Sequence, residues 1–211
     1  MSNATNAAAK SLLIPSPFCI KMALIDASFR IDGIARTERR FDLIKRLEVR
    51  IEPPEHAVVN ACFVKIRKLV DGEFGQAFAL REYVAYSGVI RIALNVEHLS
   101  SEERQTLVGL LVQINQLGKR GCFVQLTSAP AISDGVLPTT FATELMLSGE
   151  LATIGTLQLL DEMQQDTSLR QVDAYSDVGE IRGAVRKSVP TILRYRRIES
   201  SKGYTAYERT K

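Results

Sequence analysis

The sequence is poor in the residues and motifs that carry most enzyme chemistry. It has two histidines, His56 and His98, and neither has a cysteine, a histidine or a carboxylate near it at metal-ligand spacing. The Walker loop, the G-x-S-x-G nucleophile motif and the G-x-G-x-x-G dinucleotide motif are also absent from the sequence. We therefore expect no metal and no cofactor, and we predict that the protein is not an enzyme.

Cysteines and long apolar runs are scarce as well. Cys19, Cys62 and Cys122 are odd in number, far apart and surrounded by apolar residues, a pattern typical of buried thiols rather than of disulfides or a zinc site. No segment has the roughly 18 consecutive apolar residues of a membrane-spanning helix. Residues 1–10 lack the basic start and the apolar centre of a signal peptide. These absences predict a cytoplasmic protein that does not contact a membrane.

The charges that are present lie unevenly along the chain. The net charge of the protein is +3, but residues 182–211 hold nine basic and two acidic residues, a net charge of +7, which leaves −4 for the rest. Tyr195, Tyr204 and Tyr207 lie among these charges. Because cations bind phosphates and flat rings stack on bases, this segment predicts contact with nucleic acid; the alternative is a solvated edge.

Two helices are expected in the first third of the chain. Ser16 is a good N-cap and Pro17 suits a first helical turn, so one helix is expected to begin there and to continue to about Phe29. A second is expected over residues 37–49, ended by Pro53–Pro54. Its arginine-rich side is compatible either with nucleic acid or with solvent.

The middle of the chain alternates between strand and helix patterns. We expect strands over residues 56–70 and 79–94, the second bent or bulged at Gly88. A helix over residues 102–117 that stops at Gly118 and a short strand over residues 122–130 follow. This order predicts an α+β, ferredoxin-like or RNA-recognition-motif-like fold with its first strand weak or missing.

The last third is expected to form an extension to this core. Residues 150–163 favour a helix of about three turns, although Gly155 weakens that prediction. Residues 191–200 and 203–209 favour a β-hairpin that carries the arginines and tyrosines. The predicted organisation is thus a core over residues 1–130 and a β-rich extension over residues 131–211, with a loop, a helix and a basic hairpin.

Three sequence blocks carry a resemblance to a known family. They are LLIPSPFCIKMAL at residues 12–24, ALREYVAYSGVIRIAL at residues 79–94, and SSEERQTLVGLLVQINQLGKRGCFVQLTSAP at residues 100–130. With the arginine-rich hairpin after them, the chain resembles the RAMP-superfamily subunit that caps the 5′ end of the guide RNA in type I CRISPR Cascade complexes. It is most like the archaeal-type A subtype.

The resemblance implies a non-catalytic subunit that binds the 5′ handle of the guide crRNA. Its implied partners are that RNA, the repeating backbone subunit, the large subunit and, through the complex, target DNA. The proline-rich start would hold backbone near phosphates, and the Gly118–Gly121 turn would contact a phosphate. The candidate phosphate contacts are Lys10, Lys21, Lys119, Arg120, Arg194, Arg196, Arg197 and Lys202, and the candidate stacking faces are Tyr195 and Tyr204.

Two departures from the family keep alternatives open. The family has a strand before its first helix, whereas about ten residues precede that helix here, so a shortened chain or a strand supplied by a neighbour is expected. One subtype processes guide RNA with a tyrosine, lysine and histidine set that has no residue-by-residue match here. The alternatives are a metal-independent endoribonuclease that uses His56 and an architectural protein without specific RNA binding.

Overall fold

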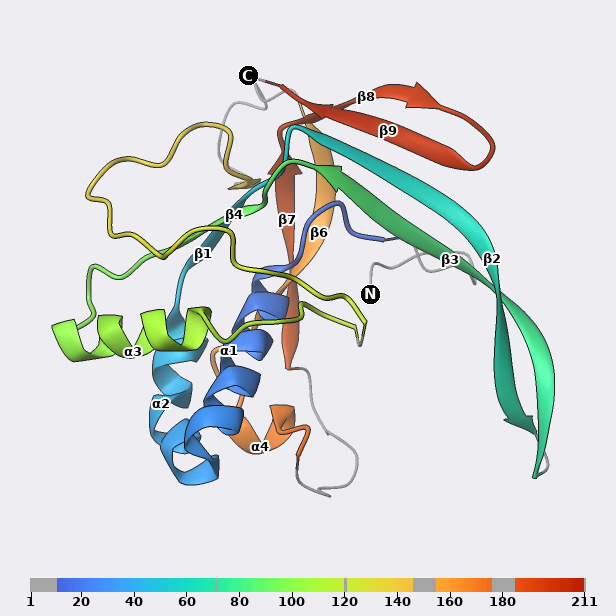
Figure 1. The fold of residues 1–211 in the computed structure, drawn as a ribbon. Coiled ribbons are helices and arrows are strands. Elements are labelled where there is room, and N and C mark those ends of the chain that lie inside the picture. Colours follow the sequence, from blue (N-terminus) through green and yellow to red (C-terminus); the bar gives the residue numbers. More distant parts are fainter. Residues whose placement is uncertain (1–10, 71, 120, 146–154, 176–184, 211) are drawn as a thin grey trace.

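The protein is an α+β fold built from antiparallel sheets. The structure, a computed structural model, describes residues 11–70, 72–119, 121–145, 155–175 and 185–210. Helices gather at one end of the molecule, and a long two-stranded ribbon projects away from them (Figure 1). The architecture is compatible with the expected ferredoxin-like RAMP fold. Among the described residues, the helices are too short or too polar to span a membrane.

Two consecutive helices begin the fold. In α1, Pro17–Asp32, the hydroxyl of Ser16 accepts the backbone N–H of Cys19 at 3.3 Å, which confirms the predicted start. Gly33, at a φ of +73°, turns the chain into α2, Ile34–Arg46. The second helix therefore begins and ends three residues earlier than expected, because the chain becomes extended at Leu47.

The projecting ribbon begins and ends on one small sheet. Strand β1, Val49–Glu52, pairs with β4, Arg91–Leu94. Between them, β2, His56–Val70, and β3, Glu73–Ser87, pair over their full lengths without a register shift. The predicted limits of β2 are confirmed, and Gly88, at a φ of +101°, separates β3 from β4.

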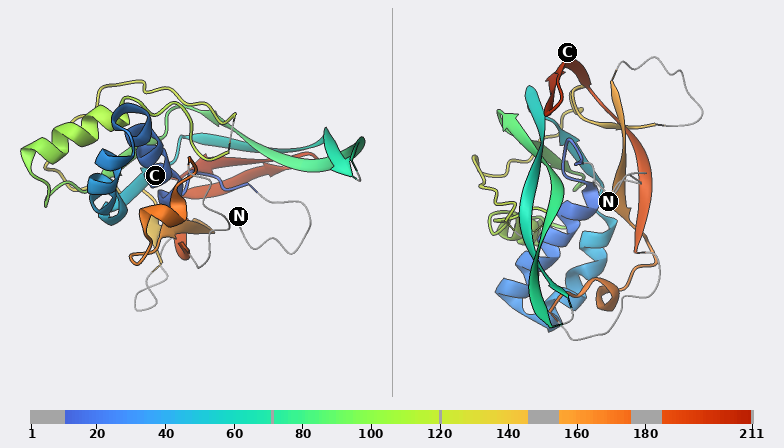
Figure 2. Two further views of the ribbon diagram at one scale, coloured as in Figure 1. Left: turned by 90° about the horizontal axis from the view of Figure 1, so that it is seen from below. Right: turned by 90° about the vertical axis from the view of Figure 1, so that its right-hand side faces the viewer.

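The carboxyl-terminal hairpin joins the root of the ribbon. Strands β8, Tyr195–Ser200, and β9, Tyr204–Arg209, form the predicted hairpin, and β9 pairs with residues 56–60 of β2. The sheet order is β3-β2-β9-β8. Beyond residue 60 the ribbon has two strands, and we call residues 61–82 the arm (Figures 1 and 2). The division into two domains near residue 130 stays a prediction.

A third sheet corrects one expected helix. It has the order β5-β7-β6, formed by Thr143–Glu144, Arg186–Leu193 and Thr156–Met163. The helix expected over residues 150–163 is wrong where the structure describes it, since β6 pairs with all eight residues of β7. Residues 150–154 lie outside the described residues. Pairing with a distant strand has overridden a local preference for helix.

The helix before the Gly118 turn is shorter than predicted. α3, Ser101–Leu111, starts at a capping box made by Ser100 and Glu103 but ends seven residues before Gly118. The strand expected over residues 122–130 is also wrong, because this stretch has one isolated bridge, between Gln116 and Phe123. A one-turn helix, α4, covers Leu169–Val172.

One hydrophobic core holds these elements together. Apolar side chains from α1, α2, α3, β1, β6 and β7 are almost fully buried against one another. Each such leucine, isoleucine or phenylalanine contributes about 1.5–3 kcal/mol by its burial. The core centres on α1 and includes Ile20, Leu24, Ile25, Phe41, Ile44, Ile51, Leu107, Leu110, Leu160, Met163 and Leu193. We call the elements that share this core the body of the protein, and the arm projects from it (Figure 1).

Candidate nucleic-acid interface

One face of the arm carries exposed aromatic rings between cations. Alternate residues of a strand share a face, and directly paired residues of neighbouring strands lie on the same face. The register pairs Phe63 with Leu80, Lys65 with Phe78, Arg67 with Gln76, and Leu69 with Phe74. We call this side the inner face of the arm.

The phenylalanines of the inner face are unusually open. Phe63, Phe74 and Phe78 are 77%, 71% and 75% exposed. Lys65 and Arg67 are exposed beside them. Rings that present flat faces between cations suit the bases and phosphates of a single strand, with about 1–3 kcal/mol per stacked base.

The opposite side, the outer face of the arm, has a different composition. It carries Cys62, Val64 and Ile66, which are half-buried, with the exposed cations Lys68 and Arg81. The inner face alone combines phenylalanine rings with cations. We therefore assign the candidate interface to the inner face.

The inner face points toward the segment that precedes α1. The hydroxyl of Tyr86 donates to the carbonyl of Leu13 at 2.8 Å, and the backbone N–H of Ser11 donates to the carboxylate of Glu82 at 2.7 Å. Tyr86 and Glu82 share the inner face by register. Burial raises the pKa of Tyr86 to about 12, so it stays a neutral donor. Residues 11–16, which we call the lead segment, thus lie at the root of the arm.

The turn that begins at Gly118 lies beside the first turn of α1. Its carbonyl at Lys119 accepts the N–H of Cys122 at 3.0 Å, and Gly118 adopts a φ of +82°. A β-carbon on Gly118 would lie 3.5 Å from the sulfur of Cys19, in the first turn of α1. Lys119 is exposed. The predicted turn is thus close to the start of α1, while Lys10 and Arg120 lie outside the described residues.

Lys21 does not fit the predicted role of a phosphate contact. Its side chain is 2% exposed, its ammonium lies 2.7 Å from the carboxylate of Glu162, and it donates to the carbonyl of Lys45 at 2.8 Å. The lysine is on the buried side of α1, where the apolar stripe would place a core residue. Lys21 joins α1 to α2 and β6.

Tyr195 corrects a second prediction, since it is not a stacking face. It is 1% exposed, and its hydroxyl donates to the carbonyl of Pro54 at 2.8 Å. Its ring packs against Tyr207 with 6.1 Å between centroids. Burial raises the pKa of Tyr195, so the hydroxyl remains a donor. Tyr195 fastens the Pro53–Pro54 link, through which the chain passes from the body into β2.

The same link is held by an ionic cluster centred on Glu52. This carboxylate is 7% exposed, lies 2.9 Å from the guanidinium of Arg209 and 2.6 Å from that of Arg91, and accepts the hydroxyl of Thr140. Burial opposes its ionisation, but the hydrogen bonds and the two cations outweigh burial and hold its pKa below the usual range. Arg209 also donates to the carbonyl of Pro53 at 2.8 Å. The arm is therefore anchored by β9 and β4.

The other candidate RNA contacts of the basic hairpin differ in how exposed they are and in whether they already have a partner. Arg196 binds the carboxylate of Glu208 at 2.6 Å, and this hydrogen bond lowers the pKa of Glu208. The hydroxyl of Tyr204 donates to Glu199. Arg194 is half-buried, with a buried Nε that has no hydrogen-bond partner in the described part of the chain. Arg197 and Lys202 are exposed.

The histidines and cysteines form no metal centre in the described part of the chain. His56 is exposed and lies opposite Glu208 in the β2–β9 ladder. The prediction of buried thiols is wrong for Cys122, which is exposed at the end of the Gly118 turn. Cys19 is mostly buried, and burial, with the Cys122 thiol nearby, raises its pKa to about 11.

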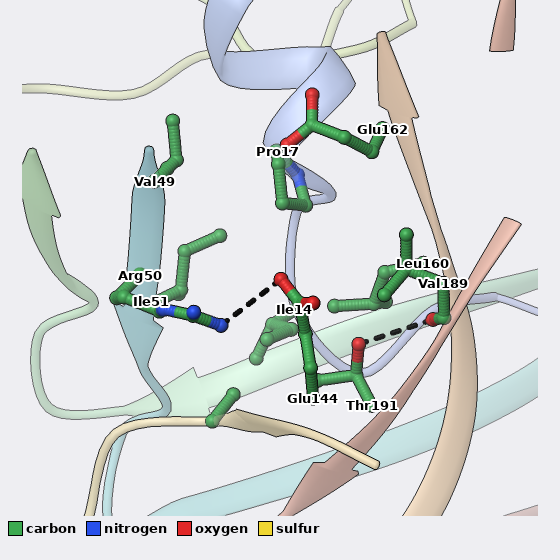
Figure 3. A pocket seen from close by; sticks show the side chains of 11 residues that line it. Ile14, Pro17, Val49, Arg50, Ile51, Glu144, Leu160, Glu162, Val189 and Thr191 are labelled. Carbon is green, nitrogen blue, oxygen red and sulfur yellow. Dashed lines mark hydrogen bonds and ion pairs between the residues drawn. The ribbon is translucent and has the colours of Figure 1, made fainter. Parts of the chain in front are cut away.

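A small cavity separates the lead segment from two sheets. Ile14 and Pro17 line it on one side, with residues of β1, β6 and β7 on the others (Figure 3). Arg50 and Glu144 meet across it at 3.1 Å. Its volume of about 20 Å³ holds about one water molecule. The cavity is too small for a ligand.

Sequence reasoning missed the inner face of the arm. The strands were expected, but Phe63, Lys65, Arg67, Phe74 and Phe78 were not proposed as a site. The available signal was the alternation of residues along β2. Phe63, Lys65 and Arg67 are all odd-numbered and so share one face, and cations on a face exclude its burial in a core.

Comparison with known proteins gives one informative similarity. No protein-family model matches the chain. Over 97 residues the chain is 29% identical to the CRISPR-associated protein Cas5 of Archaeoglobus fulgidus. The match covers 43% of this chain and spans 42% of the length of that protein. The similarity supports a CRISPR-associated protein of the RAMP type.

Proposed function

We propose that the protein is a non-catalytic, guide-RNA-binding subunit of a type I CRISPR Cascade complex in the cytoplasm. It would cap the 5′ handle of the crRNA, next to the repeating backbone subunit and the large subunit, and meet target DNA through the complex. The observation that carries the proposal is the inner face of the arm, where exposed phenylalanines alternate with cations. The similarity to a CRISPR-associated protein favours RNA as the ligand.

The chemistry of the inner face suits a single strand better than a duplex. Phe63, Phe74 and Phe78 can stack only on bases whose faces are open, and the bases of a duplex already stack on one another. Lys65 and Arg67 would neutralise the phosphates between those bases. The lead segment lies at the root of the arm, so a strand on the inner face could continue toward it.

The first experiment identifies the RNA. The chain is co-expressed with its genomic neighbours, any complex is purified, and the bound RNA is sequenced. We expect short RNAs that share one constant 5′ segment. A purified complex whose RNA has no common 5′ end, or a protein that binds no RNA, would contradict the proposal.

The second experiment locates the site by comparing two neighbouring cations. Arg67 lies on the inner face and Lys68 on the outer face, so Arg67→Ala and Lys68→Ala remove the same charge from opposite sides. We expect Arg67→Ala to weaken binding and to lower the salt dependence by about 0.7 in the slope of log K against log salt. Lys68→Ala is the matched control. Equal losses from both variants would refute the assignment to the inner face.

Phe78→Ala tests the stacking part of the proposal. Loss of one stacked base costs about 1–3 kcal/mol of binding free energy. Because no charge changes, the salt dependence of binding should stay the same. A change in salt slope without a loss of affinity would contradict stacking by Phe78.

A further inference from the structure

The outer edge of β3 is long and pairs with no other strand in the described part of the chain, although Ser11 bonds to it at Glu82. β3 is the terminal strand of its sheet, has fifteen residues and pairs with β2 without a bulge. The other edge strand, β8, has six residues and an irregularity between Arg197 and Glu199. Short strands and bulges keep edges from pairing with other chains. The β3 edge has neither form of protection.

The backbone groups that face this edge can be identified. The carbonyl of Glu82 accepts a hydrogen bond from the hydroxyl of Ser11, outside the β2–β3 ladder, so Glu82 points its backbone away from β2. Its ladder partner, Ala61, points its N–H the other way, to Gly203. The N–H and C=O of one residue point to the same side of an antiparallel strand, and those of the next residue point to the other side. The even-numbered residues of β3 therefore direct their backbone groups to its outer edge. Among residues 73–81 these are Phe74, Gln76, Phe78 and Leu80.

The sequence of this edge is complementary to itself. If two copies of residues 73–81 run antiparallel about Ala77, Glu73 of each copy lies opposite Arg81 of the other. Phe74 lies opposite Leu80, and Gly75 lies opposite Ala79. Oppositely charged and large apolar cross-strand pairs both favour pairing. Glu73 and Arg81 are exposed, and neither has an ion-pair partner among the described residues.

We propose that two copies of this chain associate through their β3 edges, centred on Ala77. The pairing joins two arms into one four-stranded sheet, β2-β3-β3-β2, with both inner faces on the same side. The even-numbered residues of each copy supply the backbone hydrogen bonds. The arm gains from this pairing because a two-stranded ribbon is marginally stable in water.

The association is weak because one strand edge is a small interface. We expect a dissociation constant on the order of 10 µM, which lies far above that of an obligate dimer. The proposal does not depend on RNA, since it uses the edge of the sheet rather than its inner face. It therefore stands or falls separately from the proposed function.

Sedimentation velocity of the purified, RNA-free chain from about 1 to 200 µM tests the proposal, because this range brackets weak association. Wild type is expected to shift from monomer to dimer. Gln76→Pro is expected to stay monomeric, since proline removes an N–H that faces the outer edge and leaves the β2–β3 ladder intact. Circular dichroism confirms that the variant keeps its strands.

A charge exchange tests the register. Arg81→Glu places like charges opposite each other twice and is expected to weaken association about tenfold or more. The double variant Glu73→Arg/Arg81→Glu restores both pairs and should associate like wild type, which also shows that it folds. A monomeric wild type at the highest concentration, a dimeric Gln76→Pro variant, or an exchange that fails to restore association would each overturn the proposal.

Discussion

Replacing Glu52 by glutamine should loosen the link between the body and the arm. Glutamine keeps the size of the side chain and one acceptor oxygen but removes the charge that Arg209 and Arg91 share. Arg209 is 16% exposed, so its ion pair with Glu52 lies between an exposed pair, worth up to about 1 kcal/mol, and a buried pair, whose loss costs about 3–5 kcal/mol. Arg91 is 60% exposed, which reduces its contribution to about 0.5 kcal/mol. The expected loss in the free energy of unfolding at pH 7 is about 2–3 kcal/mol.

The effect depends on pH in a definite direction. The pKa of Glu52 is lower in the folded protein than in the unfolded chain, where it is about 4.3. Its ionised form therefore stabilises the protein above that value, and the stabilisation is lost as the pH falls through the folded pKa. Wild type and Glu52→Gln should differ fully at pH 7 and converge in acid.

Urea unfolding at pH 7 and at successively lower pH measures both effects. Glu48→Gln is the matched control, because Glu48 also binds an arginine but is 52% exposed, and its replacement should cost less than about 1 kcal/mol. The reasoning is refuted if Glu52→Gln unfolds like Glu48→Gln at pH 7. It is also refuted if the gap between Glu52→Gln and wild type stays constant as the pH falls.

Three further predictions follow from the buried contacts and the histidine. Tyr195→Phe removes the hydrogen bond to Pro54 and should lower the free energy of unfolding by about 1–2 kcal/mol in urea titrations. Lys21→Met leaves the carboxylate of Glu162 without its cation and should cost about 3–5 kcal/mol by the same assay, part of which Glu162→Gln in the same chain should recover. Purified protein should leave CRISPR repeat RNA intact on a denaturing gel, and cleavage that His56→Ala abolishes would favour the endoribonuclease alternative.

Local signals were sufficient where one neighbour decides the structure. Ser16 and Pro17 set the start of α1, and Ser100 with Glu103 sets the start of α3, because a capping residue acts within one turn. The prediction of a strand from about residue 56 to residue 70 is confirmed, since β-forming residues fill this stretch and the sequence Asp71–Gly72 after it favours a turn.

Local signals failed where a distant strand or a buried charge decides the structure. Residues 156–163 have helix-forming side chains, yet they pair with residues 186–193, far away in the sequence. The hypothesis of RNA contacts requires Lys21 and Tyr195 to be exposed, but the structure buries both. Their partners, Glu162 and Pro54, lie 141 residues away in each case, so no window of sequence around either residue could reveal the burial.

The positive charge of the carboxyl-terminal segment has a structural consequence beside the nucleic-acid contact that its composition predicts. Arg209 forms an ion pair with Glu52, and Arg196 forms one with Glu208. Two cations of this segment are therefore paired within the protein. The segment also anchors the start of β2. Tyr195 and Arg209 donate hydrogen bonds to the carbonyls of Pro54 and Pro53, and β9 pairs with the first residues of β2. On the arm itself, the ladder partners of Lys65 and Arg67 are Phe78 and Gln76, which carry no charge. Affinity for RNA should therefore fall more when the arm cations are removed than when Arg196 is removed, because the guanidinium of Arg196 is already bound to the carboxylate of Glu208.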